Sequence, residues 1–224
     1  MAIEYVNGAQ NFDLTSGSTI AAPATNHTSG NLLVVFTVCY SADATEIVSI
    51  TDTAGNTYTK INGTPDTVPL LYVEMWYAKN VIGNASNVVT VTYDGSYWVR
   101  GIQVLQYAGC DTVDPLDQTA IGKGSTGTTG ITADVTTTFA DEVLVAGDGI
   151  YNNVTHTAGT GYTIRTSLGG SEPSYGSTED MIVEEIGTYN ASFSYSSNTP
   201  WAIVMASFKA AEAPAPGRSW GAVF

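Results

Sequence analysis

Charged residues are scarce in this chain of 224 residues, at 12% of the sequence against 43% for hydrophobic residues. The hydrophobic share is ample for a packed core, so disorder is not expected for the bulk of the chain. Lysine and arginine total 7 against 21 acidic residues, and the formal net charge is −14. A protein this acidic repels phosphate backbones and anionic lipid, so we expect neither nucleic acid nor a membrane surface as a partner.

Membrane and export signals are also lacking. No run approaches ~18 consecutive apolar residues, so a transmembrane helix is not expected. Residues 1–6 have neither the basic region nor the apolar core of a signal peptide, which favours a route that needs no leader. Cys39 and Cys110 are too few for a disulfide scaffold, and they form either two buried thiols or one bridge.

Sustained helical periodicity is missing as well. Short β-branched and aromatic runs alternate instead with clusters of Gly, Asn, Asp and Thr, a pattern typical of sandwiches and barrels. Along residues 190–196, Ala191, Phe193 and Tyr195 share one face of a strand and serines share the other. Residues 32–36 are apolar on both faces, as in a central strand. We predict an all-β fold, a two-sheet antiparallel β-sandwich of the jelly-roll-like kind.

An internal repeat organises the chain. The segment TAGNTYT at residues 53–59 recurs as TAGTGYT at 157–163, and NLLVV at 31–35 matches DEVLV at 141–145. The strands that end at Tyr93 and Tyr195 are each followed by a tryptophan, Trp98 and Trp201. This order predicts a duplicated four-strand unit, with halves at about 30–109 and 140–209, packed face to face in one domain of residues 1–209. Residues 110–130 would cross between the halves.

The C-terminal segment, residues 210–224, differs in character. Its first part, 211–217, is rich in Pro and Ala and reads as an extended linker. The last residues form an aromatic arm, and we predict that Trp220, Val223 and Phe224 contact a neighbouring subunit, as buried aromatics do at interface hot spots. The alternative is a loose tail, or one that folds back on its own domain.

Four segments resemble a known group of proteins: GNLLVVF at 30–36, TDTAGNTY at 51–58, WYAKN at 76–80 and DPLD at 114–117. They are similar to jelly-roll-like β-sandwich domains found in phage structural proteins and in bacterial secreted or surface proteins. The resemblance covers roughly residues 30–209. Because these segments are strand and turn signatures, the resemblance implies a fold and a virion or extracellular setting, and it transfers no functional residue.

Catalytic motifs are not evident. No H-E-x-x-H, P-loop or G-x-S-x-G element occurs, and no Ser-His-Asp order. His27 and His156 lie in polar contexts, so we expect solvated loop residues. Glu184 and Glu185 are adjacent, and neighbours on a strand point to opposite faces, so they cannot act together as a glycosidase pair. We predict that the protein is not an enzyme.

Two weaker binding signals remain. Asp111, Asp114 and Asp117 crowd one loop, and such oxygens suit a structural Ca²⁺ ion, although ordinary turn and loop acids are the better explanation. Tyr97 and Trp98 close the segment DGSYW and offer aromatic faces to a glycan. The alternative is that Trp98 and Trp201, as repeat equivalents, are core plugs. A sugar platform could also draw on a wider aromatic set: Trp76, Tyr77, Tyr151, Tyr175 and Trp201.

From the sequence, the leading hypothesis is therefore a virion structural protein of a tailed phage: a capsid decoration, spike or fibre-type subunit that acts by assembly and surface display. Its partners would be other copies of itself or other virion proteins. The alternative is a carbohydrate-binding module or adhesin domain of a secreted or surface protein, with a cell-surface glycan as partner. No cofactor is expected, apart from the Ca²⁺ considered above.

Overall fold

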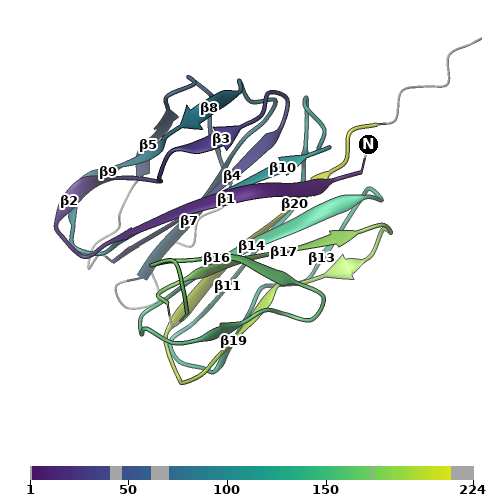
Figure 1. Cartoon of the computed structure of the whole chain (residues 1–224). Helices are drawn as coiled ribbons and strands as arrows, with labels where there is room; N and C mark the ends of the chain where they lie inside the picture. The colour runs from purple at the N-terminus through teal and green to yellow at the C-terminus, as the bar shows by residue number, and fades with distance from the viewer. Residues whose placement is uncertain (1, 41–46, 62–70, 173, 213–224) are drawn as a thin grey trace, which may run out of the picture.

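The computed structural model describes residues 2–40, 47–61, 71–172 and 174–212, and this part of the chain contains twenty strands and no helix. Two five-stranded sheets dominate it (Figure 1). The first has the order β1 (Glu4–Asp13), β10 (Arg100–Ala108), β4 (Leu32–Tyr40), β7 (Leu71–Ala78), β6 (Thr59–Lys60). The second has the order β11 (Leu116–Gly124), β20 (Trp201–Lys209), β14 (Glu142–Ile150), β17 (Ser177–Val183), β16 (Thr163–Ser167).

Smaller sheets complete each half. A three-stranded sheet in the first half has the order β2 (Gly17–Ala21), β9 (Val89–Tyr97), β5 (Ile47–Asp52). Its counterpart in the second half has the order β12 (Thr129–Ile131), β19 (Ser192–Tyr195), β15 (His156–Thr157). Two-stranded pairs are β3 (Thr25–His27) with β8 (Asn84–Asn87), and β13 (Val135–Thr136) with β18 (Thr188–Tyr189). Neighbouring strands pair antiparallel, so the predicted all-β antiparallel sandwich is confirmed.

The internal duplication is larger than the sequence indicated. Adding ten to every strand number of the first half reproduces the strand order of each sheet in the second. The repeated unit therefore has ten strands in place of the predicted four. The prediction that residues 110–130 only cross between halves is wrong, because β11 and part of β12 lie there and β11 takes the place that β1 has in the first half. Its segment is polar, and without an apolar pattern it gave no strand signal.

The sheets form four layers, with the two large sheets in the middle (Figure 1). A central core between the large sheets takes residues from both halves, such as Phe36, Met75, Val145 and Phe208. A second core lies between the first large sheet and β2-β9-β5, and a third lies between the second large sheet and β12-β19-β15. β4 and β14 are buried along both faces because each lies between two of these cores, as the doubly apolar run at 32–36 predicted.

Two glycines let the large sheets approach closely. A Cβ atom added to Gly147 would lie 2.4 Å from the ring of Phe36, and one added to Gly149 would lie 2.3 Å from Val38. Both glycines are on β14 and both partners are on β4. The two halves thus meet through side chains of one central strand packed on bare backbone of the other.

The ladders also correct the alignment of the repeat by one residue. Leu32 pairs with Tyr107 and Val143 pairs with Phe208, and all four side chains belong to the central core. Leu32 therefore corresponds to Val143 and not to Glu142. With this register, Tyr40 at the end of β4 corresponds to Tyr151, the residue after β14.

The molecule has two distinct ends. At one, which we call the base, Glu4 pairs with Ala108 and Cys110 bridges to Ala210. At the other, which we call the tip, β1, β4 and β14 end and β10 and β20 begin. The N-terminus and the last described strand, in yellow, lie on the same side in Figure 1. No helix of the described residues is long and apolar enough to cross a membrane.

Neither cysteine is in a disulfide, and both thiols are buried, Cys39 on β4 and Cys110 just after β10. Burial raises the pKa of the Cys110 thiol to about 12, and the Asp111 carboxylate adds to the shift. Of the two alternatives left by the sequence, the structure has the pair of buried thiols.

Candidate functional site: an aromatic pocket at the tip

A pocket opens at the tip where the two halves meet. Six residues with uncharged side chains line it: Leu14, Tyr40, Trp98, Val99, Tyr151 and Tyr175. The first half supplies four of them from the ends of β1, β4, β9 and β10, and the second half supplies the other two. The cavity measures about 240 Å³, close to the lower bound of pockets that hold small ligands.

Two large aromatic side chains of this tip pocket are exposed to solvent. Trp98 is 62% exposed and Tyr151 is 41% exposed, and Leu14 beside them is 44% exposed. Tyrosine and tryptophan combine an apolar ring with a polar group, which suits them to binding sites. Aromatic surface that could have joined a core is therefore presented outward at this end of the molecule.

Ring contacts join Tyr151 to the less exposed aromatic residues of the pocket. Tyr40 and Tyr151 stack with ring centroids 5.5 Å apart and planes 6° apart. Tyr175 stacks on Phe12 at 5.1 Å and meets Tyr40 edge-on at 6.3 Å. The Tyr40 hydroxyl donates a hydrogen bond to the carbonyl of Ile150. These contacts cross between the halves, so the pocket depends on their association.

The repeat in the sequence contains a signal for the stacked pair of Tyr40 and Tyr151 that the sequence-based alignment missed. Tyr40 and Tyr151 occupy equivalent positions of the repeat, and they meet at the tip because the two halves pack through β4 and β14. The sequence-based alignment was one residue out of register, which set Tyr40 against Ile150. Tyr151 and Tyr175 were named among aromatic candidates, whereas Tyr40 was not.

The structure separates the two residues of the predicted glycan patch. Trp98 lies in the tip pocket, but Tyr97 does not line it. The Tyr97 hydroxyl donates to Asp94 Oδ1 at 2.7 Å, and its ring packs edge-on against Tyr93 with centroids 5.9 Å apart. The glycan-binding role predicted for Tyr97 stays a prediction.

The interpretation of Trp98 as a core plug is wrong, because it is mostly exposed. Trp201 is 8% exposed and packs in the core of the second half, over Gly124. The residue that corresponds to Trp201 is Arg100, since each is the first residue of its strand and pairs with the end of β4 or β14. Arg100 is buried, and its guanidinium lies 2.6 Å from Asp13.

A buried polar cluster lies behind the tip pocket, on the chain segment that carries Tyr175. Glu172 Oε2 accepts hydrogen bonds from the backbone N–H of His156 at 2.9 Å and lies 3.0 Å from His156 Nδ1. Glu172 Oε1 accepts from the hydroxyls of Ser167, Ser174 and Ser177 at 2.8, 3.2 and 2.7 Å. Backbone hydrogen bonds in both directions between Ser174 and Val154 fix the segment next to Tyr175.

His156 lies between two carboxylates. Its Nε2 is 3.1 Å from Asp148 Oδ2, and its Nδ1 faces Glu172. Burial alone would lower the pKa of His156, but the Asp148 and Glu172 carboxylates outweigh burial and raise it to about 10. Burial would raise the pKa of Glu172, yet the hydrogen bonds from His156 and Ser177 bring it down to about 2. The cluster therefore holds one imidazolium and two carboxylates.

This cluster contains the residue types of a serine nucleophile site, with Ser174 Oγ 3.3 Å from His156 Nδ1. A base must be able to accept a proton, and an imidazolium cannot. Ser174 is also 1% exposed and has no access to a substrate. The geometry supports a structural role for the cluster, and it provides no argument for catalysis.

Both histidines are buried, contrary to the solvated loops expected from their sequence context. His27 Nδ1 lies 2.9 Å from the amide of Asn87, which also donates to Asp52. Burial lowers the pKa of His27, with a smaller opposing effect of Asp52. Asp52 accepts three further hydrogen bonds, two from Asn56 and one from Tyr58, so the segment TDTAGNTY forms a hydrogen-bonded polar turn that is partly exposed.

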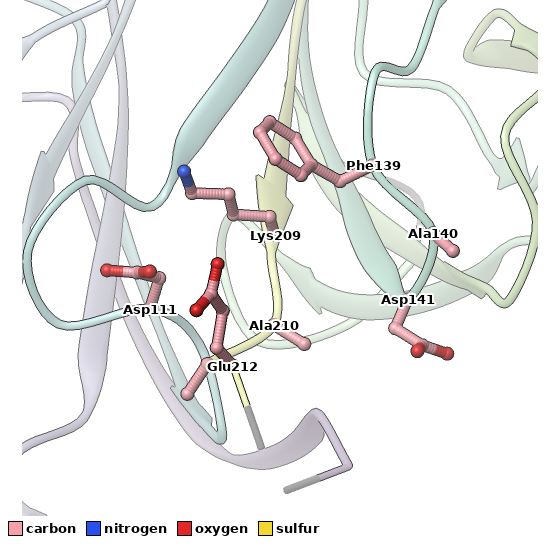
Figure 2. A pocket seen from close by; sticks show the side chains of 8 residues that line it. Asp111, Phe139, Ala140, Asp141, Lys209, Ala210 and Glu212 are labelled. Atoms are coloured by element: carbon pink, nitrogen blue, oxygen red, sulfur yellow. The ribbon is translucent and has the colours of Figure 1, made fainter. Parts of the chain in front are cut away.

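A second pocket, of about 200 Å³, lies at the base and is shown in Figure 2. Lys209 Nζ lies 4.3 Å from the centre of the Phe139 ring, so one wall of this base pocket is already covered from within the chain. The Glu212 carboxylate points toward Lys209, whereas Asp141 points away (Figure 2). The lining of the base pocket thus contains both acidic and basic side chains, whereas the lining of the tip pocket is uncharged.

The three aspartates of the predicted Ca²⁺ site are not gathered around a common point. Asp111 Oδ1 accepts from the backbone N–H groups of Val113 and Asp114. Asp117 accepts from the backbone and hydroxyl of Thr138. Across the described residues, no three His, Cys, Asp or Glu side chains lie close enough to bind one ion. The arm residues Trp220, Val223 and Phe224 lie outside the part of the chain that the structure describes.

Comparisons with known proteins do not supply a family. The chain matches no protein-family model and no curated protein. One similar solved structure is the C-terminal domain of the AgI/II polypeptide BspA of Streptococcus agalactiae, with 11% sequence identity and a TM-score of 0.24. That similarity spans 91% of this chain and 92% of the streptococcal one. A similarity at this level is too low to assign a function.

Proposed function

We propose that this protein is a non-catalytic recognition domain that binds a cell-surface glycan in the tip pocket. The observation that carries the proposal is the outward presentation of Trp98 and Tyr151 from a rigid double sandwich. Pyranose rings have an apolar face that stacks on aromatic side chains. Binding sites of this kind favour rigid aromatic groups because little conformational entropy is lost when they are covered.

The placement of the pocket supports the same role. The tip lies at the opposite end of the large sheets from the base, where the first strand begins and Ala210 is bridged. A domain held at its base would present the tip outward. Loop ends carried on a rigid scaffold are a common location for binding residues.

A glycan array with purified protein tests the proposal. We expect binding that is lost in Trp98→Ala and in Tyr151→Ala, with melting temperatures within about 2 °C of the parent because exposed side chains contribute little to stability. Phe139→Ala, which removes an aromatic ring at the base, is the matched control and should bind like the parent. Binding that survives loss of both tip rings would refute the proposal.

We further propose that this recognition domain is displayed on a virion or another extracellular surface and anchored from its base. The observation behind this proposal is that Glu212, the last described residue, lines the base pocket, at the opposite end of the large sheets from the tip. Deletion of residues 218–224 should abolish incorporation into assembled particles while the melting temperature stays unchanged. Normal assembly of the shortened protein would remove the arm from the account.

A further inference from the structure

The lining of the tip pocket is mostly aromatic and contains no charged side chain. Three tyrosines and one tryptophan contribute four of its six residues, and the other two are aliphatic. The face of each ring carries the negative end of its quadrupole. Such a surface attracts cations, and the attraction grows when the contact is desolvated.

Carboxylates outnumber the cationic group in the polar cluster behind the pocket, so the cluster adds net negative charge to that of the ring faces. Asp148 is fully buried, and its charge contributes, after burial itself and the neighbouring rings, to the raised pKa of Tyr40. In the polar cluster behind Tyr175, the carboxylates of Asp148 and Glu172 outnumber the imidazolium of His156 by one. The guanidinium of Arg100, which follows the lining residue Val99 in the chain, is paired with Asp13. The whole chain adds a net charge of −14.

The negative potential of the ring faces and carboxylates discriminates between ligands by their charge. Carboxylates below a low-dielectric wall stabilise a cation at the pocket and repel an anion. A sialic or uronic acid would therefore be disfavoured there. At about 240 Å³, the cavity is large enough for a charged head group.

The type of cation follows from the lack of a charged acceptor in the lining. A primary ammonium carries three N–H donors, and burying it is costly unless each donor finds an acceptor. No carboxylate lines the cavity, so the acceptors among its side chains are neutral tyrosine oxygens, including that of Tyr40, whose hydroxyl donates to the Ile150 carbonyl. A trimethylammonium group has no N–H donor, so it can be desolvated against ring faces without leaving a donor unpaired.

We propose that the tip pocket binds a quaternary ammonium group of the choline type, carried by the surface polymer that the domain recognises. This inference rests on the proposed glycan-recognition function and specifies the chemical group that the pocket takes. Trp98 and Tyr151 supply the solvent-exposed rings, while Tyr40 and Tyr175 are the other two aromatic residues of the lining.

Choline and its uncharged carbon isostere, 3,3-dimethylbutan-1-ol, form the test pair, since they have nearly the same shape and differ in charge. Each is titrated into the full chain, with saturation-transfer NMR and tryptophan fluorescence as readouts. We expect choline to bind at least ten-fold more tightly than the isostere. Trp98→Ala and Tyr151→Leu should abolish choline binding, and Phe139→Ala should leave it unchanged.

The outcomes separate this inference from the proposed function. Equal binding of choline and its isostere would overturn the inference, because the pocket would then be selecting shape and apolar surface alone. Choline binding that persists in Trp98→Ala would also overturn it. If choline fails to bind while array glycans without an ammonium group bind through Trp98, the inference falls and glycan recognition stands. If neither binds, both fall.

Discussion

The close approach of Gly147 to Phe36 gives the sharpest prediction about how the halves associate. An added Cβ would lie 2.4–2.8 Å from three atoms of the aromatic ring, well inside van der Waals contact. Both residues are in the middle of central strands and are buried between two sheets, so neither can move far. Overpacking of this kind costs ~1–3 kcal/mol. Gly147→Ala should therefore lower the free energy of unfolding by about 2 kcal/mol, or the melting temperature by roughly 2–4 °C per kcal/mol for a chain of this size.

A double-mutant cycle with Phe36→Leu tests whether contact with the Phe36 ring causes the destabilisation by Gly147→Ala. The smaller side chain creates space opposite the new methyl group, so the cost of Gly147→Ala should shrink in the Phe36→Leu background. We expect the double variant to be more stable, by ~1 kcal/mol or more, than the sum of the two single effects predicts, which is within the range found for residues in contact. Urea unfolding followed by circular dichroism provides the free energies. A loss below about 0.5 kcal/mol for Gly147→Ala, or costs that simply add, would refute the packing described for the two large sheets.

Three further predictions concern buried ionisable groups. Burial raises the pKa of Glu142 to about 7, with Asp117 adding to it; stability should fall as pH rises from about 4.5 through 7, and Glu142→Gln should be the more stable protein at pH 8 but not at pH 4. Because the pKa of His156 is raised to about 10, the stabilisation that its charged form provides is complete below pH 6.5 and is lost as pH rises through 10. The melting temperature of His156→Gln should therefore change less with pH over that range than that of the parent. An equal pH dependence in the two proteins would contradict the ion-pair geometry. Cys39 and Cys110 are buried thiols; a reducing agent should leave the melting temperature unchanged, and rapid reaction with a thiol reagent in the native state would show that they are accessible.

Much of the fold could be predicted from the sequence because strand patterns are local. The doubly apolar run from Leu32 became β4, a central strand covered on both faces, and the alternating segment at Phe193 became β19 with one face in a core. β11 could not be predicted in this way. Its partners are supplied by β20, far along the chain, so its strand conformation depends on a ladder and not on its own apolar pattern.

The candidate site was harder to predict, because it depends on contacts between the halves. Tyr40 and Tyr175 are ordinary tyrosines in the sequence, and they become pocket walls only when β4 meets β14. Similarly, the polar neighbours of His156 suggested solvent exposure, whereas its real partners, Asp148 and Glu172, are brought to it by tertiary structure. A one-residue error in the repeat alignment was enough to conceal the equivalence of Tyr40 and Tyr151.

Crystals of the protein soaked with the tightest-binding array glycan would test the recognition function most directly. The account predicts ligand density at the tip, with a sugar ring or its substituent in contact with Trp98 and Tyr151. Density at the base, beside Phe139 and Lys209, together with an empty tip, would contradict it.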